Sequence, residues 1–193
     1  RPFTSKDLDI TGNRELLEHI KRITNGAVFY SEPRSPVIGY VEASLGDGLR
    51  KIEVLRDVKG LGRDELTDAI PVTVGNLVVH LLAPIKVLKA KICNVVTLDQ
   101  TGRNDLNHVR IMILCVREFI LDLVESAAGG SVSQRDVVDF LEELREIVLS
   151  PVASKAENMW NLDFGKVWPV KELGGSGLQK IERFVQHRIS PLD

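Results

Sequence analysis

The chain has 193 residues and a mass of 21.5 kDa, enough for one ordinary domain or for a small domain with a helical appendage. Hydrophobic residues make up 44% and charged residues 27%, a balance that excludes a disordered or fibrous protein. The 25 basic and 27 acidic residues give a net charge of −2, so any site for a nucleic acid must be local and cannot rest on bulk charge.

The first part of the chain has the pattern of a mixed or mainly antiparallel sheet with one helix. Alternation predicts a strand over Asp7 to Thr11, and apolar residues at helical spacing predict a helix over Asn13 to Thr24 that Asn25-Gly26 ends. Gly46-Asp47-Gly48 has the turn chemistry of an antiparallel hairpin. The other elements expected here are strands over Ala27 to Tyr30, Pro36 to Leu45 and Leu49 to Val58, a short helix over Arg63 to Ile70, and one or two strands over Pro71 to Leu82.

After Pro84 the apolar spacing becomes helical and stays so. The expected helices run from Pro84 to Leu98, from Asp105 to Ala127, from the capping residue Ser133 to near Pro151, and from Leu178 to Ile189. Trp160 and Trp168 are expected to pack the tail onto these helices. Strands followed by helices predict an α+β protein, with one domain over residues 1–83 and a helical domain over residues 84–193.

Cysteine usage and hydropathy indicate the compartment. Cys93 and Cys115 lie in apolar stretches and belong to no Cys-x-x-Cys or Cys/His cluster, so we expect neither a disulfide framework nor a structural zinc. The apolar stretch from Val78 to Leu88 is interrupted before it reaches the length of a bilayer. We therefore expect a cytoplasmic protein without membrane contact, and the sequence does not indicate its oligomeric state.

Two acids near the start of the chain suggest a site. Asp7 and Asp9 flank Leu8, and residues two apart on a strand share one face about 6.6 Å apart. Leu8 and Ile10 are then expected to point into the core and to hold the acids outward. A divalent cation would relieve the repulsion, since Mg²⁺ uses one or two carboxylates together with substrate phosphates.

Glu53 is the candidate for a third acid on a neighbouring strand. It lies in Lys51-Ile52-Glu53-Val54-Leu55 and has apolar flanks like those of the first pair. Its role would be to share a second metal ion and to take the proton from an attacking hydroxyl, as in nucleotidyl transfer. The alternative is that these acids form a solvated strand face, as most acidic triplets do.

These residues resemble the polymerase-beta-type nucleotidyltransferase superfamily, and more closely its minimal branch that includes the AbiE-type abortive-infection toxins. The resemblance rests on Thr4 to Ile10, on Ile52 to Arg56 and on the basic helix after Pro84. It implies a nucleotidyltransferase-like sheet with flanking helices and a toxin–antitoxin setting. The residues it implies are Asp7, Asp9 and Glu53 as catalytic ligands of Mg²⁺ or Mn²⁺, and Ser5, Lys6, Lys86 and Lys89 as contacts to a nucleoside triphosphate.

Two departures from the family pattern bear on activity. The family places a Gly-Gly or Gly-Ser turn, which holds the triphosphate, upstream of the acid pair, and six residues precede Asp7 here. We therefore expect either a fragment of a longer chain or a protein that holds its nucleotide differently. The third acid of the family is usually Asp, and Glu53 is one methylene longer.

The predicted function is metal-dependent transfer of a nucleoside monophosphate from a triphosphate to a hydroxyl of RNA, a protein or a small molecule. The alternative is a module that keeps the fold without the chemistry and acts on a partner protein. For the lysines after Pro84, which also include Lys91, the alternative is an ordinary solvated helix face.

Overall fold

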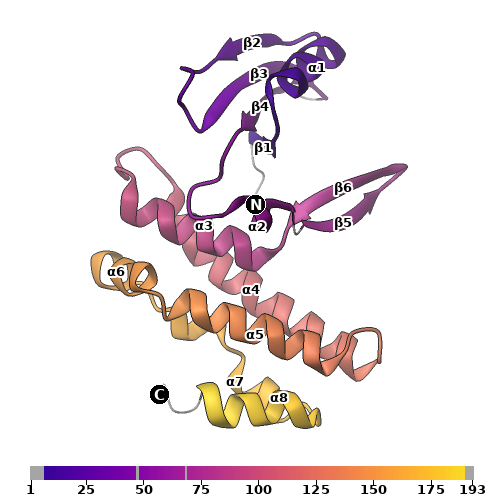
Figure 1. The fold of residues 1–193 in the computed structure, drawn as a ribbon, viewed down its shortest axis with the longest axis vertical. Coiled ribbons are helices and arrows are strands. Elements are labelled where there is room, and N and C mark those ends of the chain that lie inside the picture. Colours follow the sequence, from indigo (N-terminus) through magenta and orange to yellow (C-terminus); the bar gives the residue numbers. More distant parts are fainter. Residues whose placement is uncertain (1–6, 47, 68, 190–193) are drawn as a thin grey trace. The chain divides into compact units, whose positions relative to one another are not determined.

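The computed structural model of the protein describes residues 7–46, 48–67 and 69–189. Its fold class is α+β, with a mixed four-stranded sheet, a two-stranded sheet and a long helical part (Figure 1). The predicted α+β class and the mixed sheet are therefore confirmed. No helix within the described residues is long and apolar enough to cross a membrane.

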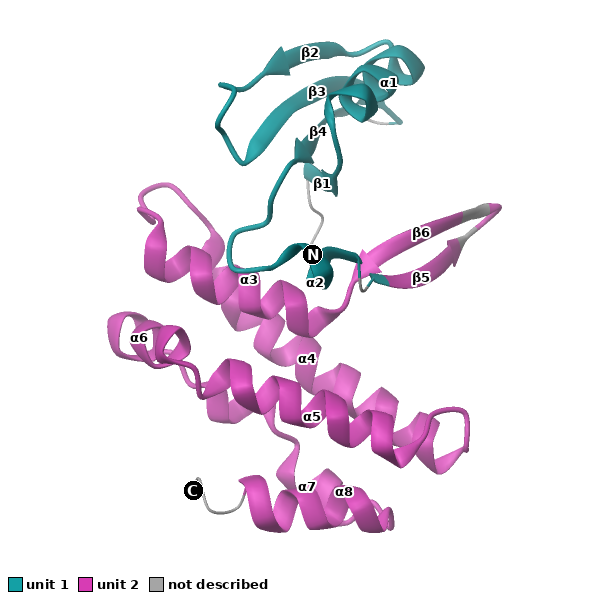
Figure 2. Cartoon of the chain, in the orientation of Figure 1, with its two compact units in different colours: residues 1–69 teal, residues 70–193 magenta. Residues whose placement is uncertain are grey.

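The chain divides into two compact units, residues 1–69 and residues 70–193 (Figure 2). We expected the division near Pro84. It lies earlier because the hairpin of β5 (Ala69–Val74) and β6 (Leu77–Leu82) forms its own two-stranded sheet and groups with the helices. The first unit holds β1 (Asp7–Thr11), α1 (Arg14–Thr24), β2 (Ala27–Tyr30), β3 (Val37–Leu45), β4 (Gly48–Leu55) and α2 (Arg63–Thr67).

The sheet of the first unit has the strand order β1-β4-β3-β2. β3 and β4 form the expected antiparallel hairpin, and Gly46 in its turn has a φ of 59°, which a residue with a Cβ rarely adopts. β2 pairs antiparallel with β3, whereas β1 pairs parallel with β4. The parallel pair is possible because α1 and two further strands separate β1 from β4 along the chain.

Helix α1 covers one face of this sheet. Asn13 caps its start by accepting a hydrogen bond from the Leu16 amide at 3.0 Å, and Asn25 ends it with a left-handed φ of 52°. The core beneath it is formed by Leu17 and Ile20 of α1 and by Val41, Ala43, Ile52 and Val54 of β3 and β4. The opposite face of the sheet, which we call the open face, carries the side chains that alternate with these residues.

The prediction that Leu8 points into the core is wrong. Leu8 is 55% exposed, whereas Ile10, two residues further along β1, is half-buried against the core of the first unit. The reason is that β1 lies at the edge of the sheet, while α1 packs mainly over β3 and to a lesser extent over β2 and β4. Helix α1 therefore does not cover Leu8.

The second unit is built around its own apolar core. Its elements are β5, β6, α3 (Pro84–Thr97), α4 (Asp105–Ala128), α5 (Gln134–Val148), α6 (Pro151–Trp160), η1 (Phe164–Val167), α7 (Val170–Gly174), α8 (Gln179–Phe184) and η2 (Val185–Ile189). Leu88, Val116, Ile120 and Leu141 lie at the centre of the core. Both tryptophans join the tail to it as predicted, since the Trp160 indole donates to the Val95 carbonyl at 2.9 Å and Trp168 is buried.

Candidate functional site

One transverse row of residues crosses all four strands of the sheet. Asp9 on β1 is the register partner of Glu53 on β4, Glu53 is the partner of Tyr40 on β3, and Tyr40 is the partner of Phe29 on β2. Each of the four alternates along its strand with a residue of the core, so all four lie on the open face. The row therefore runs from two acids to two aromatic rings.

The structure brings the three predicted acids onto this face. Asp7 lies two residues from Asp9 on the same strand, and Glu53 lies on the neighbouring strand with Ile52 and Val54 buried on either side of it. The expected placement of Glu53, on the strand adjacent to the acid pair and on the same face, is the observed one. Its side chain is partly buried, whereas Asp7 and Asp9 are exposed.

Lys51, for which the sequence pattern predicts no role, lies among these acids. It is the register partner of Asp7, forms an ion pair with Glu53, and places its ammonium 4.3 Å from the centre of the Tyr40 ring. The hydrogen bond to Glu53 raises the pKa of Lys51 above its ordinary value against the opposing effect of burial, and the charges of Glu53 and Asp7 add to the rise. Lys51 is therefore a fixed positive charge on the acidic side of the face.

The acids do not form a complete site for a divalent cation within the part of the chain that the structure describes. Within the described residues, no group of three or more His, Cys, Asp or Glu side chains is gathered so as to hold a metal ion, and Glu53 is engaged by Lys51. Carboxylate oxygens are nevertheless the donors that Mg²⁺ prefers, and one or two of them suffice when substrate phosphates complete the shell. Asp7 and Asp9 supply two carboxylates on one face.

The lysines implied by the resemblance have different surroundings. Lys86 is 7% exposed and forms an ion pair with Glu143 of α5, so it joins two helices of the second unit. Lys89 is partly buried on α3. Ser5 and Lys6 lie outside the described residues. Among the described lysines, Lys51 is the one that the structure places with the acids.

Lys91, which we expected on the same basic helix, belongs to a charged cluster around one buried carboxylate. Asp105 is 3% exposed and accepts from Arg103 Nε at 2.6 Å, from Lys91 Nζ at 3.2 Å and from Asn94 Nδ2 at 3.4 Å. Burial alone would raise the pKa of Asp105, but the hydrogen bonds from Arg103 and Lys91 outweigh it and hold that pKa below its ordinary value. This cluster fixes the start of α4 against α3.

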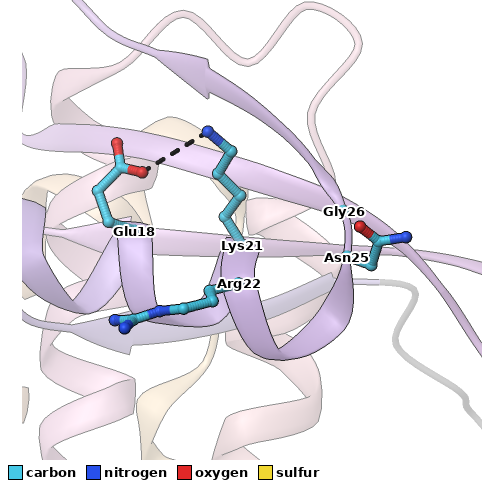
Figure 3. A pocket seen from close by; sticks show the side chains of 5 residues that line it. All are labelled: Glu18, Lys21, Arg22, Asn25 and Gly26. Atoms are coloured by element: carbon cyan, nitrogen blue, oxygen red, sulfur yellow. Dashed lines mark ion pairs between the residues drawn. The ribbon is translucent and has the colours of Figure 1, made fainter.

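A separate hollow lies at the C-terminal end of α1 (Figure 3). It has a volume of about 500 Å³ and is lined by Glu18, Lys21, Arg22, Asn25 and Gly26. Glu18 and Lys21 form an ion pair at 3.7 Å across one helical turn, so part of its charge is already neutralised. The hollow includes none of the acids of the row, and its open, polar lining gives it no specific chemistry.

Sequence reasoning missed Lys51, Tyr40 and Phe29 as members of the face. A signal for Lys51 was present, because a residue two positions before Glu53 on a strand shares its face. Tyr40 and Phe29 depend on the register of three strands, which alternation within one strand does not give.

Comparison with known proteins adds no assignment to this geometry. No family model matches the chain, and no curated protein matches it.

Proposed function

We propose that the chain is a nucleotidyltransferase-like protein that transfers a nucleoside monophosphate from a nucleoside triphosphate to a hydroxyl acceptor. The observation that carries the proposal is the register of Asp9 with Glu53 on parallel neighbouring strands, with Asp7 on the same face. Three carboxylates on one face of a sheet, next to a fixed lysine, suit a substrate that brings phosphate charge and a cation with it. The acceptor class is RNA, a protein or a small molecule.

Each residue of the acidic end has a part in the proposed reaction. Asp7 and Asp9 would hold Mg²⁺ or Mn²⁺, and that ion when bound supplies neutralisation of the phosphate charge. The acceptor oxygen forms a bond to the α-phosphorus, the bond to the pyrophosphate oxygen breaks, and the hydroxyl proton passes to the Glu53 carboxylate. The Lys51 ammonium attracts the phosphates to the same face.

A second candidate is a module that keeps the fold without the chemistry. The observation that favours it is the ion pair of Lys51 with Glu53, because a lysine that already neutralises the third acid reduces the need for a cation. In this case the open face would bind a nucleotide or a partner protein and release no pyrophosphate.

The experiment compares binding and turnover in the wild-type chain and in Asp9→Asn. Mg²⁺ with a triphosphate should raise the Tm of the wild type, because a ligand that binds only the folded state stabilises it by about 2.7 kcal/mol at a hundred times its Kd. Asp9→Asn should keep the unliganded Tm, since Asp9 is exposed, but should lose this rise and the transfer of an α-phosphate label.

Glu15→Gln is the matched control, because Glu15 is an exposed acid of the same unit that lies on α1 and not on the open face of the sheet. It should behave as the wild type does. Failure of calorimetry to detect triphosphate binding at millimolar Mg²⁺ would refute the nucleotidyltransferase proposal. Binding without label transfer would replace it with the non-catalytic module.

A further inference from the structure

Two aromatic rings, those of Phe29 and Tyr40, form a stacked pair at one end of the row. The rings of Phe29 and Tyr40 lie 4.8 Å apart between centroids with an interplanar angle of 17°. Such near-parallel pairs are stabilised by about 0.5–1.5 kcal/mol beyond the area they bury. Phe29 is nevertheless 42% exposed, which is a large fraction for a phenylalanine on the face of a sheet.

Lys51 holds this stack from the other side. β3 lies between β4 and β2, so Lys51 of β4 reaches the Tyr40 ring from one side and Phe29 of β2 reaches it from the other. The ion pair with Glu53 and the cation–π contact with Tyr40 restrain the lysine. Among the described residues, Phe29 is thus the outer ring of a stack that is fixed at its inner end.

The distance from the acids to the outer ring suits one nucleotide. Glu53 and Phe29 are two strands apart in the same row, which corresponds to about 10 Å at the usual strand spacing. A nucleotide has its base and its phosphates on opposite sides of one sugar. When the phosphates lie at the acidic end, the base falls over the aromatic end.

We propose that Phe29, supported by Tyr40, is a stacking platform for the base of the nucleotide that binds to the open face of the sheet. This inference rests on the proposed function, because the acids and Lys51 are what orient the phosphates. Stacking accepts any base, since every base has a π-face, so the platform contributes affinity and little discrimination between bases. The platform is a binding element and not a catalytic one.

The test uses the full chain and 2-aminopurine riboside triphosphate, whose fluorescence falls when its base stacks. Phe29→Ala should weaken its binding roughly ten- to a hundredfold and abolish the quenching, because aromatic stacking contributes about 1–3 kcal/mol per base. Phe29→Trp should retain both. Inorganic tripolyphosphate with Mg²⁺, which has no base, should bind Phe29→Ala as tightly as it binds the wild type.

Tyr30→Ala is the matched control. Tyr30 is the next residue of the same edge strand and is also exposed, but it points to the other face, where Arg14 of α1 lies 4.5 Å from its ring centre. The Tyr30→Ala variant should bind the 2-aminopurine nucleotide and quench its fluorescence as the wild type does. Equal affinity and equal quenching in Phe29→Ala and the wild type would overturn the platform, as would an equal loss in Tyr30→Ala.

Separate measurements distinguish a failure of the platform proposal from a failure of the proposed function. 2-Aminopurine riboside without phosphates, measured without metal, probes the platform alone. If the wild type quenches its fluorescence and Phe29→Ala does not, the platform is supported even when no label is transferred. Tripolyphosphate binding that depends on Asp9 probes the acids alone. Normal transfer by Phe29→Ala at an unchanged KM would reject the platform and leave the proposed function standing.

Discussion

Asp105 is the carboxylate for which the structure predicts the clearest pH dependence. Because its folded-state pKa is lowered, it contributes stability above its ordinary value of 3.8, and this contribution is lost as the pH falls through the lowered pKa. Asp105→Asn should therefore destabilise the helical unit near neutral pH, by up to about 3 kcal/mol for a broken buried pair. It should also flatten the fall in stability below pH 4. Urea unfolding followed by circular dichroism between pH 2 and pH 7 measures both effects.

Asp122→Asn is the control for Asp105→Asn, because Asp122 is an exposed acid on the same helix. It should leave the pH profile as it is in the wild type. An Asp105→Asn profile parallel to that of the wild type from pH 2 to pH 7 would show that the cluster with Arg103 and Lys91 does not govern acid unfolding.

At the residue scale, the sequence predicted the position of Glu53 on the sheet better than it predicted the burial and the partners of other residues. The flanks of Glu53 are apolar and both are buried, so alternation placed its carboxylate on the face that it occupies. Alternation failed for Leu8, because the burial of an edge-strand residue depends on where α1 ends its cover and not on β1 itself. Lys86 could not be placed either, since its partner Glu143 is on α5, far along the chain.

At the scale of elements, the approach of β2 and α1 to β3 depends on Gly39. A Cβ at this position would lie 2.4 Å from the Phe29 carbonyl oxygen and 2.8 Å from Leu17 Cδ2, and the first of these is backbone that cannot move alone. Gly39→Ala should therefore destabilise the first unit by about 1–3 kcal/mol, as overpacking does. Because Phe29 lies opposite the same segment, the variant should also perturb the aromatic stack.

Gly174→Ala is the control for Gly39→Ala, because a Cβ at position 174 meets no atom within 4 Å. The free energy of unfolding from denaturant titration is the measurement. A Gly39→Ala protein as stable as Gly174→Ala would mean that β2 lies further from β3 than the structure places it.

Most elements were predictable because their periodicity is strong, and the differences have local causes. The helix expected from Ser133 to near Pro151 ends at Val148, and Pro151 instead starts a new helix, since proline is well tolerated at a first helical turn. The short helix expected over Arg63 to Ile70 ends at Thr67, and the β-branched residues that follow enter β5. The order of strands in the sheet was not predictable, because the alternation of apolar and polar residues within one strand does not indicate which strand pairs with it.

At the scale of the whole molecule, the two units have separate cores. The buried residues under α1 form one cluster, and those of the helices form another. We therefore expect residues 70–193 to fold without residues 1–69, with helical circular dichroism and a cooperative thermal transition. Ile120→Ala in that fragment should lower its stability by about 2–5 kcal/mol, because Ile120 is fully buried.

Leu114→Ala is the matched control in the same fragment, since Leu114 lies on the same helix and is exposed. It should change the Tm little. A fragment that lacks a cooperative transition would show that the helical core needs the first unit to form.

The parallel pairing of β1 with β4 has a consequence for the order in which the sheet forms. β3 and β4 are joined by a tight turn and close early, whereas β1 must wait for a strand that is made much later in the chain. We therefore expect Asp7 and Asp9 to reach Glu53 and Lys51 only after β3 and β4 have paired. β1 is an edge strand and β3 is not, so native-state hydrogen exchange should report the amides of β1 opening at lower free energy than those of β3. A nucleotide that bridges the acids and the aromatic rings would slow that exchange, and protection of β1 is then a readout of binding that needs no turnover.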